Sequence, residues 1–149
     1  MILGSDHAGF ATKERLKKLF DKKGIEYEDL GAHELNLKDD YPDIAFKVGE
    51  KVAKTKSRGI LLCGTGAGMI IAANKVKGIR AVEAYDTFTA RLSREHNDTN
   101  ILSLSEWHIP FDKIKKIVDV WLNTKYSKDE RHVRRLRKIA NYENQKGRK

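Results

Sequence analysis

The chain has 149 residues, 40% of them hydrophobic, and carries a formal net charge of +9. This length suits one ordinary domain with its own buried core, and no segment reaches the roughly 20 consecutive apolar residues that a membrane-spanning helix needs. The single cysteine excludes an intramolecular disulfide and is typical of a reducing compartment. We therefore expect one domain over residues 1–149, cytoplasmic and without a membrane partner.

Short apolar segments alternate with segments of helical periodicity along the first 104 residues. Strands are expected at 1–4, 25–30, 59–63, 78–82 and 100–104, and helices at 10–23, 42–52, 69–75, 86–95 and 111–122. Residues 59–63 are wholly apolar apart from a glycine, which is typical of a central strand in a parallel sheet. Gly24 is expected to end the first helix, Pro42 suits the first turn of the second, and Asp86 is the expected N-cap of the fourth.

This alternation predicts an α/β fold with a five-stranded, parallel, doubly wound, Rossmann-like sheet and an extra C-terminal helix. In such sheets ligands bind beyond the carboxyl ends of the strands. Three segments with polar side chains are expected to meet there, namely 5–9, 63–68 and 96–98.

The most informative segment is Cys63 followed by the alternate glycines Gly64, Gly66 and Gly68. Such a loop lets backbone N–H groups approach a phosphate or a developing oxyanion closely. The same N–H groups are expected to lower the pKa of the Cys63 thiol, so that a thiolate could abstract a proton next to a carbonyl and leave an enediolate. The alternative is a buried structural cysteine, and the spacing alone leaves both interpretations open.

Two cofactor interpretations are weak. Glu83 lies 19 residues after Gly64, where a ribose-binding acid of a dinucleotide site would stand, but Met69 occupies the third glycine position of that fingerprint. A zinc site is not expected, because His33 stands alone and Cys63 has no partner at ligand spacing. We therefore expect no cofactor and no metal.

Two further pairs of residues carry polar chemistry. Asp6 and His7 follow the first strand, where Asp6 could cap a helix or accept a substrate hydroxyl while His7 donates. His96 and Asn97 come late in a helix, so His96 could merely interact with the helix dipole or could shuttle a proton near neutral pH.

Most of the positive charge lies in one C-terminal segment. Residues 125–149 contain ten Lys or Arg and three acidic residues. The helix expected at 129–144 has a thin apolar stripe, so we expect it to contact a partner subunit. Arg131 and Arg135 lie on one face of that helix and suit a phosphomonoester, although a solvated basic face is the simpler alternative.

These segments resemble ribose-5-phosphate isomerase type B, in a sugar-phosphate isomerase family that also includes galactose-6-phosphate isomerase subunits. The resemblance rests on Gly4–Phe10, Cys63–Lys75, His96–Asn100, and Arg131-His132 with Arg135. It covers almost the whole chain. It implies interconversion of D-ribose 5-phosphate and D-ribulose 5-phosphate without a cofactor, in a homodimer, or a dimer of dimers, whose subunits share their active sites.

The resemblance also implies a role for each site residue. Cys63 would move the proton between C1 and C2, Thr65 would assist at the oxygens, and His96 would open the sugar ring. The implied substrate-binding residues are Asp6, His7, Tyr41, Gly64, Gly66, Ala67, Gly68, Asn97, Arg131 and Arg135, with the two arginines arriving from a partner subunit. Met69 cannot act as a base, so Cys63 must.

One departure from the family pattern concerns the substrate. The family usually has Gly-x-Arg after the fifth strand, and this chain has Ser105-Glu106-Trp107 there. Another aldose phosphate, such as allose or galactose 6-phosphate, is therefore an alternative substrate. A less favoured alternative is a nucleic-acid-binding module that uses the basic C-terminal segment, which lacks interleaved stacking aromatics.

Overall fold

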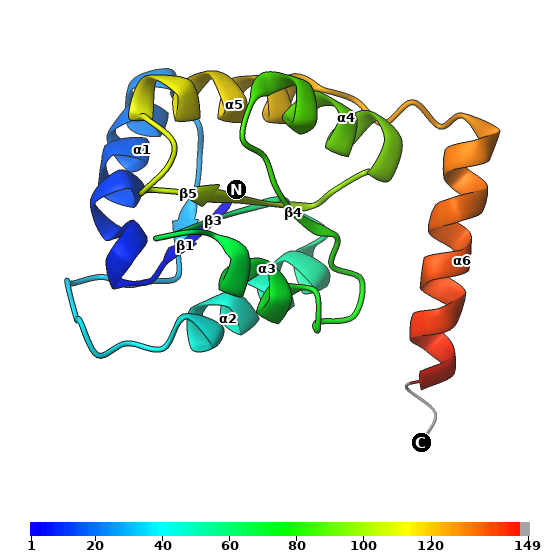
Figure 1. The fold of residues 1–149 in the computed structure, drawn as a ribbon, viewed down its shortest axis with the longest axis horizontal. Helices are drawn as coiled ribbons and strands as arrows, with labels where there is room; N and C mark the ends of the chain where they lie inside the picture. The colour runs from blue at the N-terminus through cyan, green and yellow to red at the C-terminus, as the bar shows by residue number, and fades with distance from the viewer. Residues whose placement is uncertain (147–149) are drawn as a thin grey trace.

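The computed structural model describes residues 1–146, which form a five-stranded sheet with helices on both faces (Figure 1). The strands are β1 (Ile2–Ser5), β2 (Glu28–Asp29), β3 (Gly59–Cys63), β4 (Ala81–Glu83) and β5 (Ile101–Ser105). The helices are η1 (His7–Gly9, a single 3₁₀ turn), α1 (Phe10–Lys23), α2 (Tyr41–Thr55), α3 (Ala67–Ala73), α4 (Thr87–Asn97), α5 (Phe111–Asn123) and α6 (Glu130–Lys146). The predicted α/β fold with an extra C-terminal helix is confirmed; the last three residues of the predicted basic segment lie outside the described residues.

All strand pairs are parallel, in the order β2-β1-β3-β5-β4. The register pairs Ser5 of β1 with Leu62 of β3, and Cys63 of β3 with Ser105 of β5. The segments that follow these three strands therefore emerge side by side at the carboxyl edge of the sheet.

Two apolar clusters fix the helices on the sheet. One places Leu16 and Phe20 of α1 with Trp121 of α5 against one face. The other places Val48 and Val52 of α2 with residues of α3 against the opposite face. Figure 1 shows α1, α5 and α4 on one side of the sheet and α2 and α3 on the other, so the crossovers hold the strand ends in place from both faces.

Two strands are shorter than the sequence predicts. The strand expected at 25–30 is reduced to Glu28–Asp29, because the Ile25 N–H still bonds to the Phe20 carbonyl at the end of α1. The strand expected at 78–82 begins only at Ala81, because the Ile79 N–H closes a turn on Val76. In both cases the chain leaving a helix or turn uses backbone donors that a longer strand would need.

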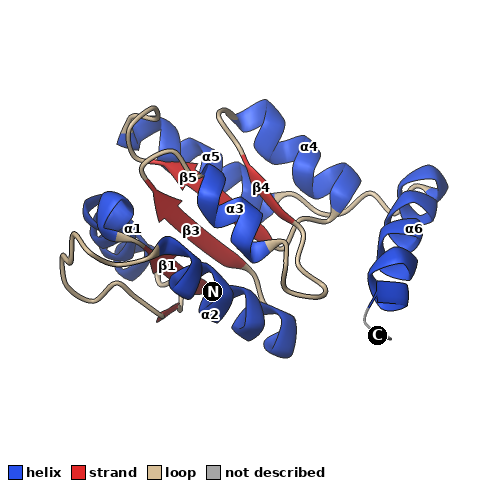
Figure 2. Cartoon of the chain, turned by 60° about the horizontal axis from the view of Figure 1, so that its bottom comes forward, coloured by secondary structure: helices blue, strands red, loops and turns tan. Residues whose placement is uncertain are grey.

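Helix α6 stands apart from the rest of the molecule (Figures 1 and 2). It touches the body at its start, through His132, and farther along, where the Glu143 carboxylate accepts the Gly78 N–H at 3.0 Å. Within residues 1–146, none of the helices combines the length and apolar character needed to cross a membrane.

Candidate active site

Cys63, the last residue of β3, lies against Asp6, which directly follows the neighbouring strand β1. The Cys63 thiol donates to Oδ2 of Asp6 at 2.8 Å, while Oδ1 of Asp6 accepts the Gly9 N–H at 3.0 Å and so caps η1. The close approach depends on Gly9, because a Cβ there would lie 2.2 Å from the Leu62 carbonyl carbon. Asp6 therefore both caps the turn, as one sequence interpretation held, and contacts the thiol.

The electrostatics at Cys63 differ from the sequence expectation. Burial raises the pKa of the thiol to about 11, and the hydrogen bond to the Asp6 carboxylate adds to this, whereas the Gly66 and Gly64 N–H groups act in the opposite direction. The prediction of a lowered thiol pKa is therefore wrong for the single chain. The loop amides do favour the thiolate, but desolvation and a facing carboxylate outweigh them.

This geometry predicts slow alkylation of Cys63 at neutral pH, because only the thiolate attacks the reagent. The rate with iodoacetamide is expected to rise with pH, towards a midpoint near 11 where no partner subunit adds positive charge near the thiol. In Asp6→Asn the charge that raises the thiol pKa is removed, so the midpoint should fall and alkylation at pH 8 should be faster. An unchanged midpoint in Asp6→Asn would show that Asp6 does not set the thiol pKa.

The glycine loop after Cys63 is tied to β5 through its carbonyl groups. Ser105 Oγ donates to the Gly64 carbonyl at 2.7 Å, and Ser103 Oγ donates to the Gly66 carbonyl at 3.1 Å. Gly66 has φ +87°, in the left-handed region that favours glycine, and α3 starts directly after it. These contacts fix a rigid loop, in which Thr65 and Ala67 are exposed and available to a ligand.

Aromatic side chains border this loop on two sides. A Cβ at Gly68 would lie 2.7 Å from the Tyr41 ring, and one at Gly64 would lie 2.6 Å from the Trp107 ring. Trp107, at the position where the resemblance implies an arginine, is 68% exposed. The glycines thus serve aromatic packing as well as backbone approach, which their spacing alone did not indicate.

His7 also lies at this edge and has an acidic partner. Its Nδ1 is 2.5 Å from Oδ1 of Asp39, and the His7 N–H donates to the same oxygen at 3.2 Å. This hydrogen bond is the main cause that raises the pKa of His7 and favours its cationic form. Sequence reasoning missed Asp39, because it lies in a loop 32 residues away with no local signal.

His96 and Asn97 do not join Cys63 within one chain. They end α4, which returns the chain from the carboxyl end of β4 to the amino end of β5. The Asn97 carbonyl accepts from Arg80 Nε at 3.1 Å, just before β4 begins. The expectation that 96–98 meets Cys63 at the carboxyl edge is therefore wrong: these residues lie at the amino edge of the sheet.

His96 instead meets the start of α6. Its ring centroid lies 4.3 Å from that of His132, which is 3% exposed and whose Nδ1 is 3.0 Å from Ser127 Oγ. Burial and then the neighbouring His96 and Arg131 lower the pKa of His132. Arg131 and Arg135, both exposed, flank His132 on α6. Sequence reasoning gave His132 no role of its own, and its contact with His96 depends on the placement of α6.

The candidate residues thus form two groups at opposite edges of the sheet. We call them the thiol half-site (Asp6, His7, Tyr41, Cys63, Thr65 and the loop 64–68) and the histidine half-site (His96, Asn97, Arg131 and Arg135). A cleft of about 790 Å³ beside the second group separates α6 from the body and is lined by Asn97, Ile79, Leu136 and Ile139, among others. Within the part of the chain described, no cluster of three or more His, Cys, Asp or Glu side chains is arranged to hold a metal ion.

Comparison with known proteins gives consistent matches over nearly the whole chain. A family model described as Ribose/Galactose Isomerase matches residues 1–139. Ribose-5-phosphate isomerase B of Escherichia coli (strain K12) is 40% identical over 141 residues, which are 94% of this chain and 93% of that protein.

Two solved structures share the fold closely. That of ribose-5-phosphate isomerase B from Clostridium thermocellum is 44% identical with a TM-score of 0.92, covering 97% of both chains. That of ribose-5-phosphate isomerase B from Mycoplasma genitalium, with bound ribulose-5-phosphate, is 40% identical with a TM-score of 0.92, covering 96% of this chain and 95% of the other.

Proposed function

Because the chain belongs to the ribose/galactose isomerase family, we propose that it interconverts D-ribose 5-phosphate and D-ribulose 5-phosphate through an enediolate, with Cys63 as the base. The observation that carries this proposal is the thiol at the end of β3, beside a rigid loop of backbone N–H groups. The relative from Mycoplasma genitalium, which binds ribulose-5-phosphate, supports the choice of substrate.

In the proposed reaction the Cys63 thiolate removes the proton from C2 of the open aldose. The electron pair of the broken C2–H bond forms the C1–C2 double bond, and the carbonyl oxygen at C1 takes up the negative charge. The loop N–H groups stabilise that charge, with Thr65 assisting at the oxygens. The hydroxyl proton on the C2 oxygen passes to the C1 oxygen, the thiol returns its proton to C1, and a carbonyl forms at C2, so that atoms and electrons balance without a redox partner.

The two half-sites would be combined across a homodimer. Since His96, Asn97, Arg131 and Arg135 lie at the edge away from Cys63, one chain cannot bring all of them to one sugar. A second chain seated near the cleft beside Asn97 would bring its Cys63 to them, and two-fold symmetry would give two such sites. His7 of one chain and the arginines of the other would then hold the phosphate.

The proposed dimer would also lower the pKa of the Cys63 thiol, which is high in a single chain. Arg131, Arg135 and His96 of a partner would add positive charge near the thiol, and opposite charges favour the ionised form. The base would thus gain thiolate character where the substrate is bound.

The substrate assignment is tested with ribose 5-phosphate, allose 6-phosphate and galactose 6-phosphate, each in the presence of EDTA. Ketose formation is expected to be fastest with ribose 5-phosphate and insensitive to the chelator. A preference for a hexose phosphate would instead mean that Trp107, which replaces the expected arginine, accompanies a change of substrate. If no aldose phosphate yields a ketose, the proposed function is wrong.

The role of His96 is tested by separating ring opening from proton transfer. His96→Ala is expected to lower the conversion of ribose 5-phosphate by about 10²-fold, as loss of a general acid–base group does. Ribulose 5-phosphate stays open, so the exchange of its C1 hydrogen with deuterium from D₂O, followed by NMR, should remain within about tenfold of wild type. Equal losses in both measurements would assign His96 to proton transfer instead.

A further inference from the structure

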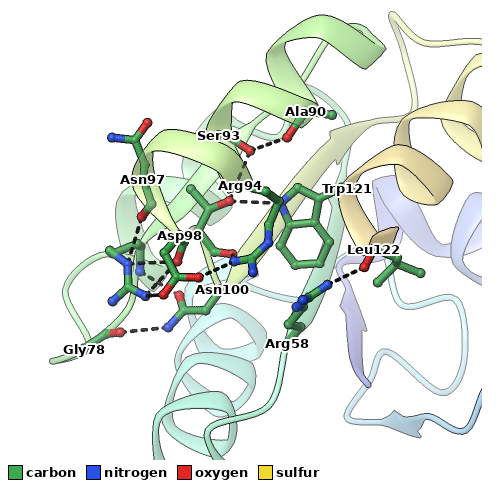
Figure 3. Close-up of polar contacts among 12 residues, drawn as sticks. Arg58, Gly78, Ala90, Ser93, Arg94, Asn97, Asp98, Asn100, Trp121 and Leu122 are labelled. Carbon is green, nitrogen blue, oxygen red and sulfur yellow. Dashed lines mark hydrogen bonds and ion pairs between the residues drawn. The ribbon is translucent and has the colours of Figure 1, made fainter. Parts of the chain in front are cut away.

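A second polar cavity lies at the amino edge of the sheet, away from the thiol half-site. It has a volume of about 390 Å³ and lies between the end of α2, the loop before β4 and the end of α4. Its lining includes the cationic side chains of Lys56, Arg58, Lys77, Arg80 and Arg94 but a single carboxylate, that of Asp98. Figure 3 shows Arg94 directed at Asp98, and Arg58, near Trp121, directed at the Leu122 carbonyl.

The single carboxylate is already shared by two of the arginines. Arg80 Nη2 lies 2.9 Å from Oδ2 of Asp98, and Arg94 Nη1 lies 2.8 Å from Oδ1. Both carboxylate oxygens are thus in use, and the cavity keeps a large excess of positive charge.

Arg58 has no ion-pair partner among residues 1–146. Its Nη1 donates to the Leu122 carbonyl at 2.6 Å, and its guanidinium lies 5.7 Å from the centroid of the Trp121 ring. Burial and the positive charge of Arg94 lower the pKa of Arg58, and the Asp98 carboxylate acts in the opposite direction. An unpaired, half-buried arginine next to another is unfavourable unless an anion balances them.

Arg94 is a second arginine of the cavity wall, and its side chain is largely removed from solvent. The residue is 5% exposed, and its Nε is buried with no hydrogen-bond partner among the described residues. Its Nη1 donates to the Thr99 carbonyl. The guanidinium groups of Arg94 and Arg58 each lie 5.7 Å from the centroid of the Trp121 ring.

The cavity wall is held rigidly by Asn100. Its Nδ2 donates to the Gly78 carbonyl at 2.8 Å, and its Oδ1 accepts the Arg80 N–H at 2.8 Å. The Trp121 indole N–H donates to Thr99 Oγ1 at 3.0 Å behind the arginines. The three arginines therefore line a preformed cavity, whereas Lys56 and Lys77, which also line it, are exposed.

We propose that this cavity binds a phosphate group, either as inorganic phosphate or as a small phosphomonoester, at a site distinct from the one where isomerisation takes place. Arginine guanidinium groups match phosphate oxygens in pairs, and a dianion balances the excess charge better than a carboxylate does. The cavity size suits a small ligand. Because it adjoins Asp98, next to Asn97 of the histidine half-site, an occupied cavity would stabilise the end of α4.

The test uses the Trp121 indole N–H signal in ¹H–¹⁵N NMR spectra of the full chain, with the Trp107 signal identified in Trp107→Phe. Inorganic phosphate and glycerol 3-phosphate are titrated separately at constant ionic strength. At least one is expected to shift the Trp121 signal saturably in the millimolar range or below. Saturation by inorganic phosphate alone would identify free phosphate as the ligand, and saturation by both would identify the phosphate group itself.

Lys56→Gln/Lys77→Gln provides the decisive variant, because both lysines are exposed and their loss leaves the buried arginine network intact. Its dissociation constant is expected to be about 10-fold higher, since two cations facing the anion are removed. Lys54→Gln, on the exposed face of α2 and outside the cavity lining, should leave it unchanged. No saturable shift with either anion, or equal affinity in the double variant, would overturn the proposal.

Discussion

Cys63→Ala is expected to lower the isomerisation of ribose 5-phosphate by about 10²–10⁴-fold, the usual contribution of a general base. The thiol lies at the carboxyl end of β3, next to the loop whose N–H groups would hold the enediolate. No other group in the proposed thiol half-site is assigned to carry the proton between C1 and C2. The loss should appear in kcat, while the dissociation constant of ribose 5-phosphate changes little.

Cys63→Ser is the matched control for this variant. A serine hydroxyl keeps nearly the same shape and can still donate to Asp6, but it is far too weak an acid to be ionised as the base. We expect its activity to fall nearly as far as that of Cys63→Ala, with thermal unfolding close to wild type. If either variant keeps more than half of the wild-type rate, Cys63 is a packing residue of the α2 face of the core and the base lies elsewhere.

Much of the fold could be predicted from local patterns. Residues 59–63 and 10–23 were predicted with the bounds they have, because an apolar run marks a central strand and Gly24 takes the left-handed φ of +65° that ends α1. The lengths of the two edge strands were overestimated, because the N–H groups of Ile25 and Ile79 form hydrogen bonds to the preceding helix or turn. The pattern of apolar residues does not reveal which backbone N–H groups are already used by a neighbouring helix or turn.

The candidate site shows where sequence reasoning ends. The motif around His96 was assigned to the carboxyl edge because it is polar, although α4 must carry the chain back to the amino end of β5. The pKa of Cys63 was expected to fall, because the sequence displays the adjacent glycines but not the burial of the thiol or Asp6, which contacts it from 57 residues away. Both the position of His96 and the pKa of Cys63 depend on contacts between residues far apart in the sequence.

The arrangement of the site across two chains makes a quantitative prediction for mixed dimers. Cys63→Ala and Arg131→Ala/Arg135→Ala are each expected to be nearly inactive alone. When the two proteins are unfolded together and refolded, about half of the dimers should be mixed, each with one intact site. About a quarter of the wild-type activity should then return. The same fraction is expected when Cys63→Ala is mixed with His96→Ala.

Mixing His96→Ala with Arg131→Ala/Arg135→Ala is the matched control, and it tests most directly whether each site takes its thiol from one chain and its histidine and arginines from the other. Both defects then lie in the histidine half-site, so every site of a mixed dimer contains one of them and activity should stay at the level of the unmixed proteins. The account predicts recovery to about a quarter in the two mixtures with Cys63→Ala and none in this one. No recovery with Cys63→Ala, with subunit exchange demonstrated by mass spectrometry, would contradict it.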